Sequence, residues 1–131
     1  MTTPTPQGTI SLQTIAMPAD TNWNGDIFGG WLVSQMDLAG AVAARRRAHG
    51  RITTIAIDSM VFHQPVKIGD VVSCYTEIER VGNTSMKIRI TAWETADPCN
   101  VPRKLTEGLF TYVAIDEAGR PRAVPADTCP T

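Results

Sequence analysis

Five stretches of this chain have the pattern of apolar and polar positions that is typical of β-strands. Alternation with a period of two indicates a strand, because successive side chains point to opposite faces of the sheet. The predicted strands are 9–16, 53–62, 71–81, 84–95 and 105–115. The fourth is the most regular, and its two faces are expected to carry Met86, Ile88, Ile90 and Ala92 on one side and Lys87, Arg89, Thr91 and Trp93 on the other.

Residues 31–48 have the pattern of one helix of about five turns. The segment is rich in Ala, Leu, Met, Gln and Arg and contains no proline. The basic run 45–47 complements the dipole at the helix end, and Gly50 is a natural residue for the turn that follows. Its expected core face consists of Leu32, Met36, Ala39 and Ala43.

The predicted order is thus a strand, one long helix and four strands in a meander, so a single helix covers one face of a five-stranded antiparallel sheet. This order predicts an α+β protein with the hot-dog fold, in which the sheet wraps around one long central helix. The length of 131 residues suits one domain. We expect a disordered lead over 1–8, the hot-dog domain over 9–118 and an irregular tail over 119–131.

Charge and cysteine content argue against several other classes of protein. Lys and Arg number 12 and Asp and Glu 13, which indicates neither a nucleic-acid nor a membrane partner. Cys74, Cys99 and Cys129 are far apart and form no cluster with the two histidines, so we expect neither a zinc site nor a disulfide framework. The first residues lack the pattern of a signal peptide, so we expect a protein of the reducing cytoplasm.

One carboxylate, Asp37, lies near the middle of the otherwise apolar helix. It argues against a membrane span, since an Asp at the centre of a spanning helix costs about 2.5–3.5 kcal/mol. The ordinary explanation is a surface carboxylate or a buried one that accepts hydrogen bonds from the backbone. Small residues around it would instead let a ligand or a partner backbone approach. Apart from Val33, its neighbours on the helix are Gly30, Ser34, Gly40, Ala41 and Ala44.

Gly29 and Gly30 precede the predicted helix, whose first N–H groups lack partners within it. Such a helix start is a candidate oxyanion site, although a sharp turn would also explain the glycines. Gly30 and Asp37 are seven residues apart, which is about 10 Å along the axis. One substrate carbon cannot lie near both. If both act on it they come from two chains, with antiparallel helices across a two-fold axis and two sites per dimer.

Three segments carry specific motifs: MPADTNWNGDIFGGWLVSQMDLAGAVAA at 17–44, SMVFHQPVKIGDVVSCY at 59–75 and IRITAW at 88–93. In these segments the chain resembles the YciA-type acyl-CoA thioesterases of the hot-dog acyl-CoA hydrolase family, and the resemblance extends over 9–118. It implies hydrolysis of acyl-CoA to a carboxylic acid and coenzyme A, with little selectivity for the acyl chain. It implies that Asp37 is the catalytic carboxylate. It also implies that an Asn in the loop before the helix of the neighbouring subunit takes part in the site, and this residue matches Asn22. The implied assembly is a homodimer as the minimal unit and a hexamer built as a trimer of dimers.

In such an enzyme Asp37 would activate a water molecule as a general base or attack the thioester carbon itself, and the sequence does not separate the two. Asn22 would hold the water or the carbonyl, and the N–H groups of Gly29, Gly30 or Trp31 would stabilise the oxyanion. Asp20 and Asp26 are assigned to the loop and the helix cap. No metal or cofactor is expected, since a thioester is already activated; coenzyme A enters only as part of the substrate and product.

Coenzyme A needs basic groups for its phosphates. The candidate binding residues surround one predicted turn, and they are Arg80, Gly82, Asn83, Thr84, Ser85 and Lys87, with Arg89, His63 and Lys67 as further candidates. Each basic residue is equally explained as a solvated surface charge. Relatives often carry a basic residue where this chain has Asn83, which departs from the family pattern.

Two other functions compete with a thioesterase. A hot-dog dehydratase would need a histidine in the helix or in the 20–30 loop, and neither segment contains one. A non-catalytic acyl-CoA-binding or regulatory module would use the same pocket without turnover. The presence of both Asp37 and Asn22 argues for catalysis.

Overall fold

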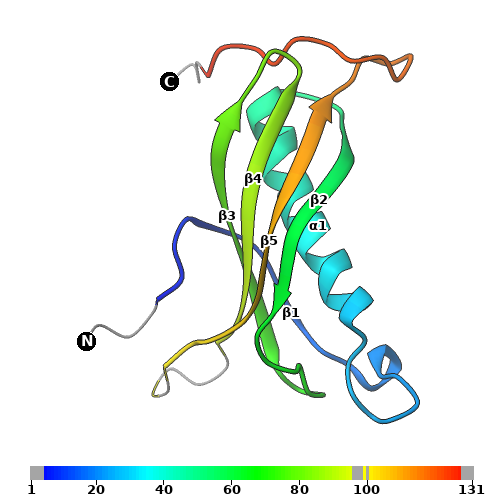
Figure 1. Cartoon of the computed structure of the whole chain (residues 1–131), viewed down its shortest axis with the longest axis vertical. Helices are drawn as coiled ribbons and strands as arrows, with labels where there is room; N and C mark the ends of the chain where they lie inside the picture. The colour runs from blue at the N-terminus through cyan, green and yellow to red at the C-terminus, as the bar shows by residue number, and fades with distance from the viewer. Residues whose placement is uncertain (1–4, 96–98, 100, 128–131) are drawn as a thin grey trace.

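A computed structural model describes residues 5–95, 99 and 101–127. In this part of the chain one long helix lies against one face of a curled five-stranded sheet (Figure 1). The elements are β1 (Thr9–Ile15), the short 3₁₀ helix η1 (Pro18–Asp20), α1 (Gly29–Ala48), β2 (Ile52–Phe62), β3 (Val71–Val81), β4 (Ser85–Glu94) and β5 (Arg103–Ala114). The predicted hot-dog fold is confirmed, and each strand and the long helix begin and end within two residues of their predicted bounds. The predicted lead falls partly on residues 1–4, and the end of the tail, with Cys129, on 128–131, which lie outside the described residues.

The strands lie in the order β1-β3-β4-β5-β2, and each neighbouring pair is antiparallel. The predicted meander is therefore wrong at β2, which pairs with β5 and not with β3. A hairpin between β2 and β3 would need a loop of a few residues. The eight residues 63–70 instead carry the chain to the other part of the sheet. At about 3.3 Å per residue they can cross the three strand spacings of about 4.8 Å that separate the two strands.

The core lies between α1 and the concave face of the sheet. The helix contributes Leu32, Met36 and Ala39, and the most regular strand, β4, contributes its four apolar residues as predicted. Trp93 departs from the prediction, because it is buried although it alternates with polar residues. Its indole N–H donates to Thr91 Oγ1 at 3.0 Å, and the pairing of β4 with β5 is irregular at this point.

The helix begins at Gly29, two residues earlier than predicted, and its N-cap residue is Phe28. No side chain caps it, so the assignment of Asp26 to the helix cap is wrong. At the other end the cap residue His49 is in the left-handed conformation, with φ 55°, and Gly50 follows it in the turn, as predicted. The irregular tail holds this end, since Arg122 Nη2 donates to the Ala48 carbonyl at 2.9 Å.

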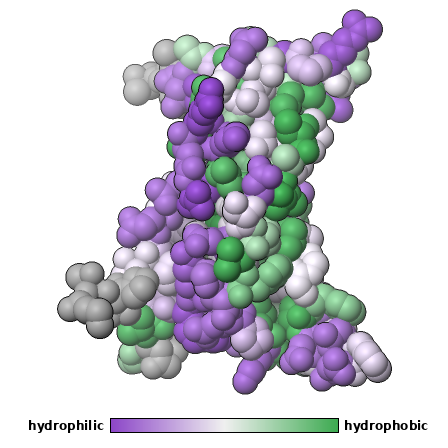
Figure 2. All heavy atoms as spheres, in the orientation of Figure 1, coloured by the Kyte–Doolittle hydropathy of each residue, from purple (hydrophilic) through white to green (hydrophobic). Residues whose placement is uncertain are grey.

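The outer strand β2 leaves a long apolar edge uncovered. Ile55 and Phe62 are 59% and 53% exposed, and Ile57 and Val61 are exposed as well. Leu38 on the neighbouring face of α1 is also exposed. Figure 2 shows hydrophobic side chains gathered along the side of the molecule that β2 and α1 form. Within the described residues, no helix has the length and apolar character that would be needed to cross a membrane.

Candidate functional site

The carboxylate of Asp37 lies half-buried between α1 and two strands of the sheet. Its Oδ1 accepts a hydrogen bond from Thr54 Oγ1 on β2 at 2.7 Å and one from the Tyr112 hydroxyl on β5 at 3.0 Å. Thr54 and Tyr112 are directly opposite each other across the β2–β5 pair, so both side chains reach the same point of the helix. Among the described residues no donor contacts Oδ2, which leaves this oxygen available for chemistry.

Gly40 makes the contact between Tyr112 and Asp37 possible. A Cβ atom at position 40 would lie 2.0 Å from the Tyr112 hydroxyl oxygen and 2.7 Å from its Cζ. The small residues around Asp37 were expected to admit a ligand or a partner backbone. At Gly40 this expectation is wrong, because the ring of Tyr112 from the same chain occupies the space.

Thr54 and Tyr112 were not identified from the sequence, although weak signals exist. Phe110 and Tyr112 alternate within an apolar strand, so the phenol had to be buried and to find a hydrogen-bond partner. Burial, with the nearby charge of Asp37 and its hydrogen bond, raises the pKa of Tyr112 well above its ordinary value. The phenol therefore keeps its proton and remains a donor. Burial also raises the pKa of Cys74 to about 12, which makes that thiol a poor nucleophile.

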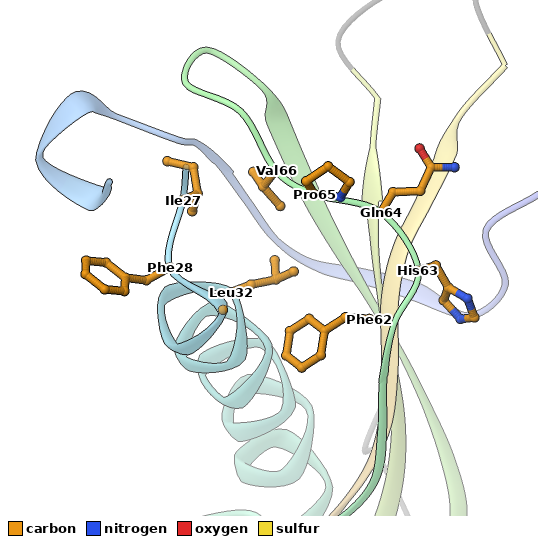
Figure 3. A pocket seen from close by; sticks show the side chains of 9 residues that line it. Ile27, Phe28, Leu32, Phe62, His63, Gln64, Pro65 and Val66 are labelled. Carbon is orange, nitrogen blue, oxygen red and sulfur yellow. The ribbon is translucent and has the colours of Figure 1, made fainter. Parts of the chain in front are cut away.

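The helix start presents two exposed glycines without a side-chain cap, Gly29 and Gly30. The N–H of Trp31 donates to the Phe28 carbonyl at 3.1 Å, so Trp31 is removed from the predicted oxyanion donors. Beside Gly29 lies a cavity of about 240 Å³. Figure 3 shows Leu32 and Phe62 projecting into the space between the helix and the 63–66 segment, while the ring of His63 points away.

The loop before the helix is closed by Asn22. Its Oδ1 accepts hydrogen bonds from the N–H groups of Asn24 at 2.9 Å and Asp26 at 3.1 Å. Among the described residues no acceptor contacts the side-chain amide N–H groups of Asn22, so these groups can act as donors. Asp20 was assigned to the loop, but it ends the short 3₁₀ helix Pro18–Asp20, where its Oδ2 accepts a hydrogen bond from the N–H of the cap residue Met17 at 3.0 Å.

The predicted binding turn, Gly82 to Ser85, lies at the opposite end of α1 from the glycines (Figure 1). Its backbone is fixed, because Gly82 N–H donates to Ser85 O at 2.8 Å and Asn83 O accepts from Val124 N–H at 2.8 Å. Thr84 O likewise accepts from Ala114 N–H.

The basic candidates for phosphate binding differ in their position and in their contacts. Arg80 and Lys87 are cross-strand neighbours beside it, and no carboxylate pairs with either among the described residues. Arg89 contacts Glu79 at 2.5 Å, and His63 lies 3.7 Å from Glu107. These carboxylates make Arg89 and His63 weaker candidates for phosphate binding.

One chain does not bring all the predicted catalytic groups together. Asp37 lies in the middle of α1, whereas Gly29 and Gly30 are its first two residues and Asn22 lies in the loop before it. The helical rise separates Gly30 from Asp37 by about 10 Å. The fold and the site therefore define a hot-dog protein with a half-buried carboxylate on the central helix and a helix start, without a side-chain cap, about 10 Å away from it.

Comparisons with known proteins agree with this class. The model of the thioesterase superfamily matches residues 24–98. The acyl-CoA thioester hydrolase YciA of Escherichia coli (strain K12) is 51% identical over 125 residues, which cover 93% of this chain and 95% of that protein. HI0827, whose solved structure is that of a hexameric broad specificity acyl-coenzyme A thioesterase, is 45% identical with a TM-score of 0.87, over 95% of this chain and 86% of that one. The chain belongs to the thioesterase superfamily, which confirms the resemblance of its sequence to the acyl-CoA thioesterases.

A more distant structure bears on the residues around Asp37. The acyl-CoA hydrolase of Staphylococcus aureus, solved with butyryl coenzyme A and coenzyme A, is 28% identical with a TM-score of 0.81, over 87% of this chain and 70% of that one. Variants of that enzyme in which one threonine or one aspartate is replaced by alanine have also been solved. The two replaced residues are 17 positions apart, as Asp37 and Thr54 are here.

Proposed function

We propose that this chain is an acyl-CoA thioester hydrolase that produces a carboxylic acid and coenzyme A from a broad range of acyl chains. The observation that carries the proposal is the carboxylate of Asp37, held through Oδ1 with Oδ2 left open. A carboxylate in this state can accept a proton or attack an acyl carbon. Membership of the thioesterase superfamily and the activity of the E. coli relative support the same reaction.

Two routes use Oδ2 of Asp37. In the first, Oδ2 takes a proton from a water molecule whose oxygen attacks the thioester carbon. In the second, Oδ2 attacks that carbon and the resulting mixed anhydride is hydrolysed by water. In both routes the C–S bond breaks, coenzyme A leaves as a thiolate, and the thiolate takes up a proton.

The remaining groups of the site come from a second copy of the chain. The N–H groups of Gly29 and Gly30 of the partner subunit stabilise the oxyanion, and the side-chain amide of its Asn22 donates to the carbonyl or the water. The exposed apolar edge of β2 supports a dimer, because such an edge is otherwise a site of aggregation. HI0827 is hexameric, so we propose a homohexamer built as a trimer of dimers.

The nucleotide of coenzyme A is assigned to the turn Gly82–Ser85, with Arg80 and Lys87 for its phosphates. Of the basic candidates near the turn these two have no carboxylate partner among the described residues. The reaction needs no further cofactor, because the carboxylate and the N–H donors supply the whole of the chemistry above. We assign the protein to the cytoplasm.

Release of thiol from acyl-CoA tests the function directly. We expect turnover with acetyl-, butyryl- and palmitoyl-CoA, measured by reaction of free coenzyme A with a thiol reagent. Binding of these thioesters without release of thiol would overturn the proposal and favour an acyl-CoA-binding module.

Mixing of two inactive variants tests the shared site. Asn22→Asp keeps the Oδ1 atom that closes the loop but removes the amide donor, and Asp37→Asn removes the carboxylate. In a hybrid dimer one site carries both changes and the other carries neither. Equal amounts of the two chains, unfolded and refolded together, should therefore recover about one quarter of the wild-type activity. A mixture with no more activity than the separate variants would place both groups in sites made by a single chain.

A further inference from the structure

We propose that Tyr112 is a positioning residue for Asp37: its phenol, admitted by Gly40, holds Oδ1 so that Oδ2 is presented to the substrate. This inference rests on the proposed function of Asp37. It adds a residue of the sheet to a site otherwise built from the helix and its preceding loop.

The position of the phenol is fixed by its surroundings. The side chain of Tyr112 is fully buried, and its ring stacks on Phe110 with centroids 6.4 Å apart and planes inclined by 12°. On the helix side the ring lies so close to Gly40 that a single methyl group there would collide with it. A ring packed on both sides cannot move its hydroxyl far without disturbing the core.

The hydroxyl contacts two oxygens of the same residue. It lies 3.0 Å from Asp37 Oδ1 and 3.0 Å from the Asp37 backbone carbonyl oxygen. This pair of contacts ties the carboxylate to one rotamer relative to the helix backbone. Thr54 adds a second donor to the same Oδ1, so both hydrogen bonds leave the lone pairs of Oδ2 untouched. A carboxylate with one oxygen held and one open has a defined direction of attack or proton transfer.

The two donors differ in how the assembly affects them. Thr54 lies on the outer strand β2, which the proposed dimer covers, whereas Tyr112 lies on β5, between β4 and β2 in the sheet. Both hydrogen bonds form within one chain, and only the one from Thr54 comes from the strand that the proposed dimer covers. Because burial raises the pKa of the phenol, it remains a donor and does not compete with Oδ2 for protons.

Tyr112→Phe tests the role, since it removes only the hydroxyl and keeps the stacked ring. The loss of a hydrogen bond to a charged group is large enough in free energy to lower kcat by about tenfold to a hundredfold. KM should change less than twofold. Tyr75→Phe is the matched control, because Tyr75 on β3 is the other tyrosine of the chain. Unchanged kcat in Tyr112→Phe, or a fall in both variants alike, would overturn the inference, as would a loss confined to KM.

A second measurement leaves Tyr112 itself unsubstituted. In the Tyr75→Phe chain grown with 3-fluorotyrosine, Tyr112 carries the one fluorine label. Its ¹⁹F resonance should shift when Asp37 is replaced by asparagine and should not shift in Asp116→Asn, a change of the same kind at an exposed turn. No shift with Asp37→Asn would overturn the contact without reference to activity. Conversely, full activity in Asp37→Asn would overturn the proposed chemistry, while the resonance would still decide whether Tyr112 holds residue 37.

Discussion

Replacement of Asp37 by asparagine should lower the rate of thioester hydrolysis by about 10²- to 10⁴-fold, the range expected when a general base is removed. Asparagine has the shape of aspartate, and its Oδ1 can accept the same hydrogen bonds from Thr54 and Tyr112. The fold and the polar contacts of the site therefore remain, and only the charge and the reactive oxygen are lost. The measurement is kcat with butyryl-CoA, together with the melting temperature.

Asp116→Asn is the matched control for this experiment. Asp116 lies in the exposed turn after β5, where its Oδ1 accepts hydrogen bonds from Ala118 N–H and Arg120 N–H, both at 2.9 Å. The same isosteric exchange there should leave kcat unchanged. A wild-type rate in Asp37→Asn would remove Asp37 from the mechanism, and an equal fall in both variants would point to a general effect on folding.

Asp37 could be singled out from the sequence as the candidate carboxylate because its signal is local. A charge in the middle of an apolar helix is conspicuous along the chain, and its distance from Gly30 follows from the helical rise alone. The alternation in β4 is local in the same way, which is why Met86, Ile88 and Ile90 are buried as predicted.

The hydrogen bonds that hold Asp37 could not be predicted, because they depend on the order of the strands. Thr54 and Tyr112 are 17 and 75 positions from Asp37 along the chain. They meet at the helix because β2 pairs with β5, in a register that places these two residues opposite each other. A period of two assigns each residue to a face of the sheet but says nothing about which strand lies beside it. The predicted meander placed β2 beside β3, and this one error separated Thr54 from Tyr112.

Gly40→Ala should destabilise the protein, although the same exchange within a helix ordinarily favours folding by about 1 kcal/mol. The added Cβ would lie 2.0 Å from the Tyr112 hydroxyl oxygen and 2.5 Å from Ile90 Cδ1. These clashes can be relieved only if the buried ring of Tyr112 moves. Overpacking of this kind costs about 1–3 kcal/mol of stability. The melting temperature should fall by roughly 2–8 °C for each kcal/mol. Hydrolysis should weaken too, since the displaced phenol no longer holds Asp37.

Two further variants separate packing at Gly40 from helix propensity. Gly30→Ala makes the same exchange in the same helix, where a Cβ meets no atom within 4 Å, so it should not lower the melting temperature. Adding Tyr112→Phe to Gly40→Ala removes the oxygen at 2.0 Å but leaves Cζ at 2.7 Å, so stability should recover only in part. A Gly40→Ala protein as stable and active as the wild type would mean that the ring yields freely. A ring that yields freely could not fix the direction of the Asp37 carboxylate, so this one glycine tests the packing on which the geometry of the site depends.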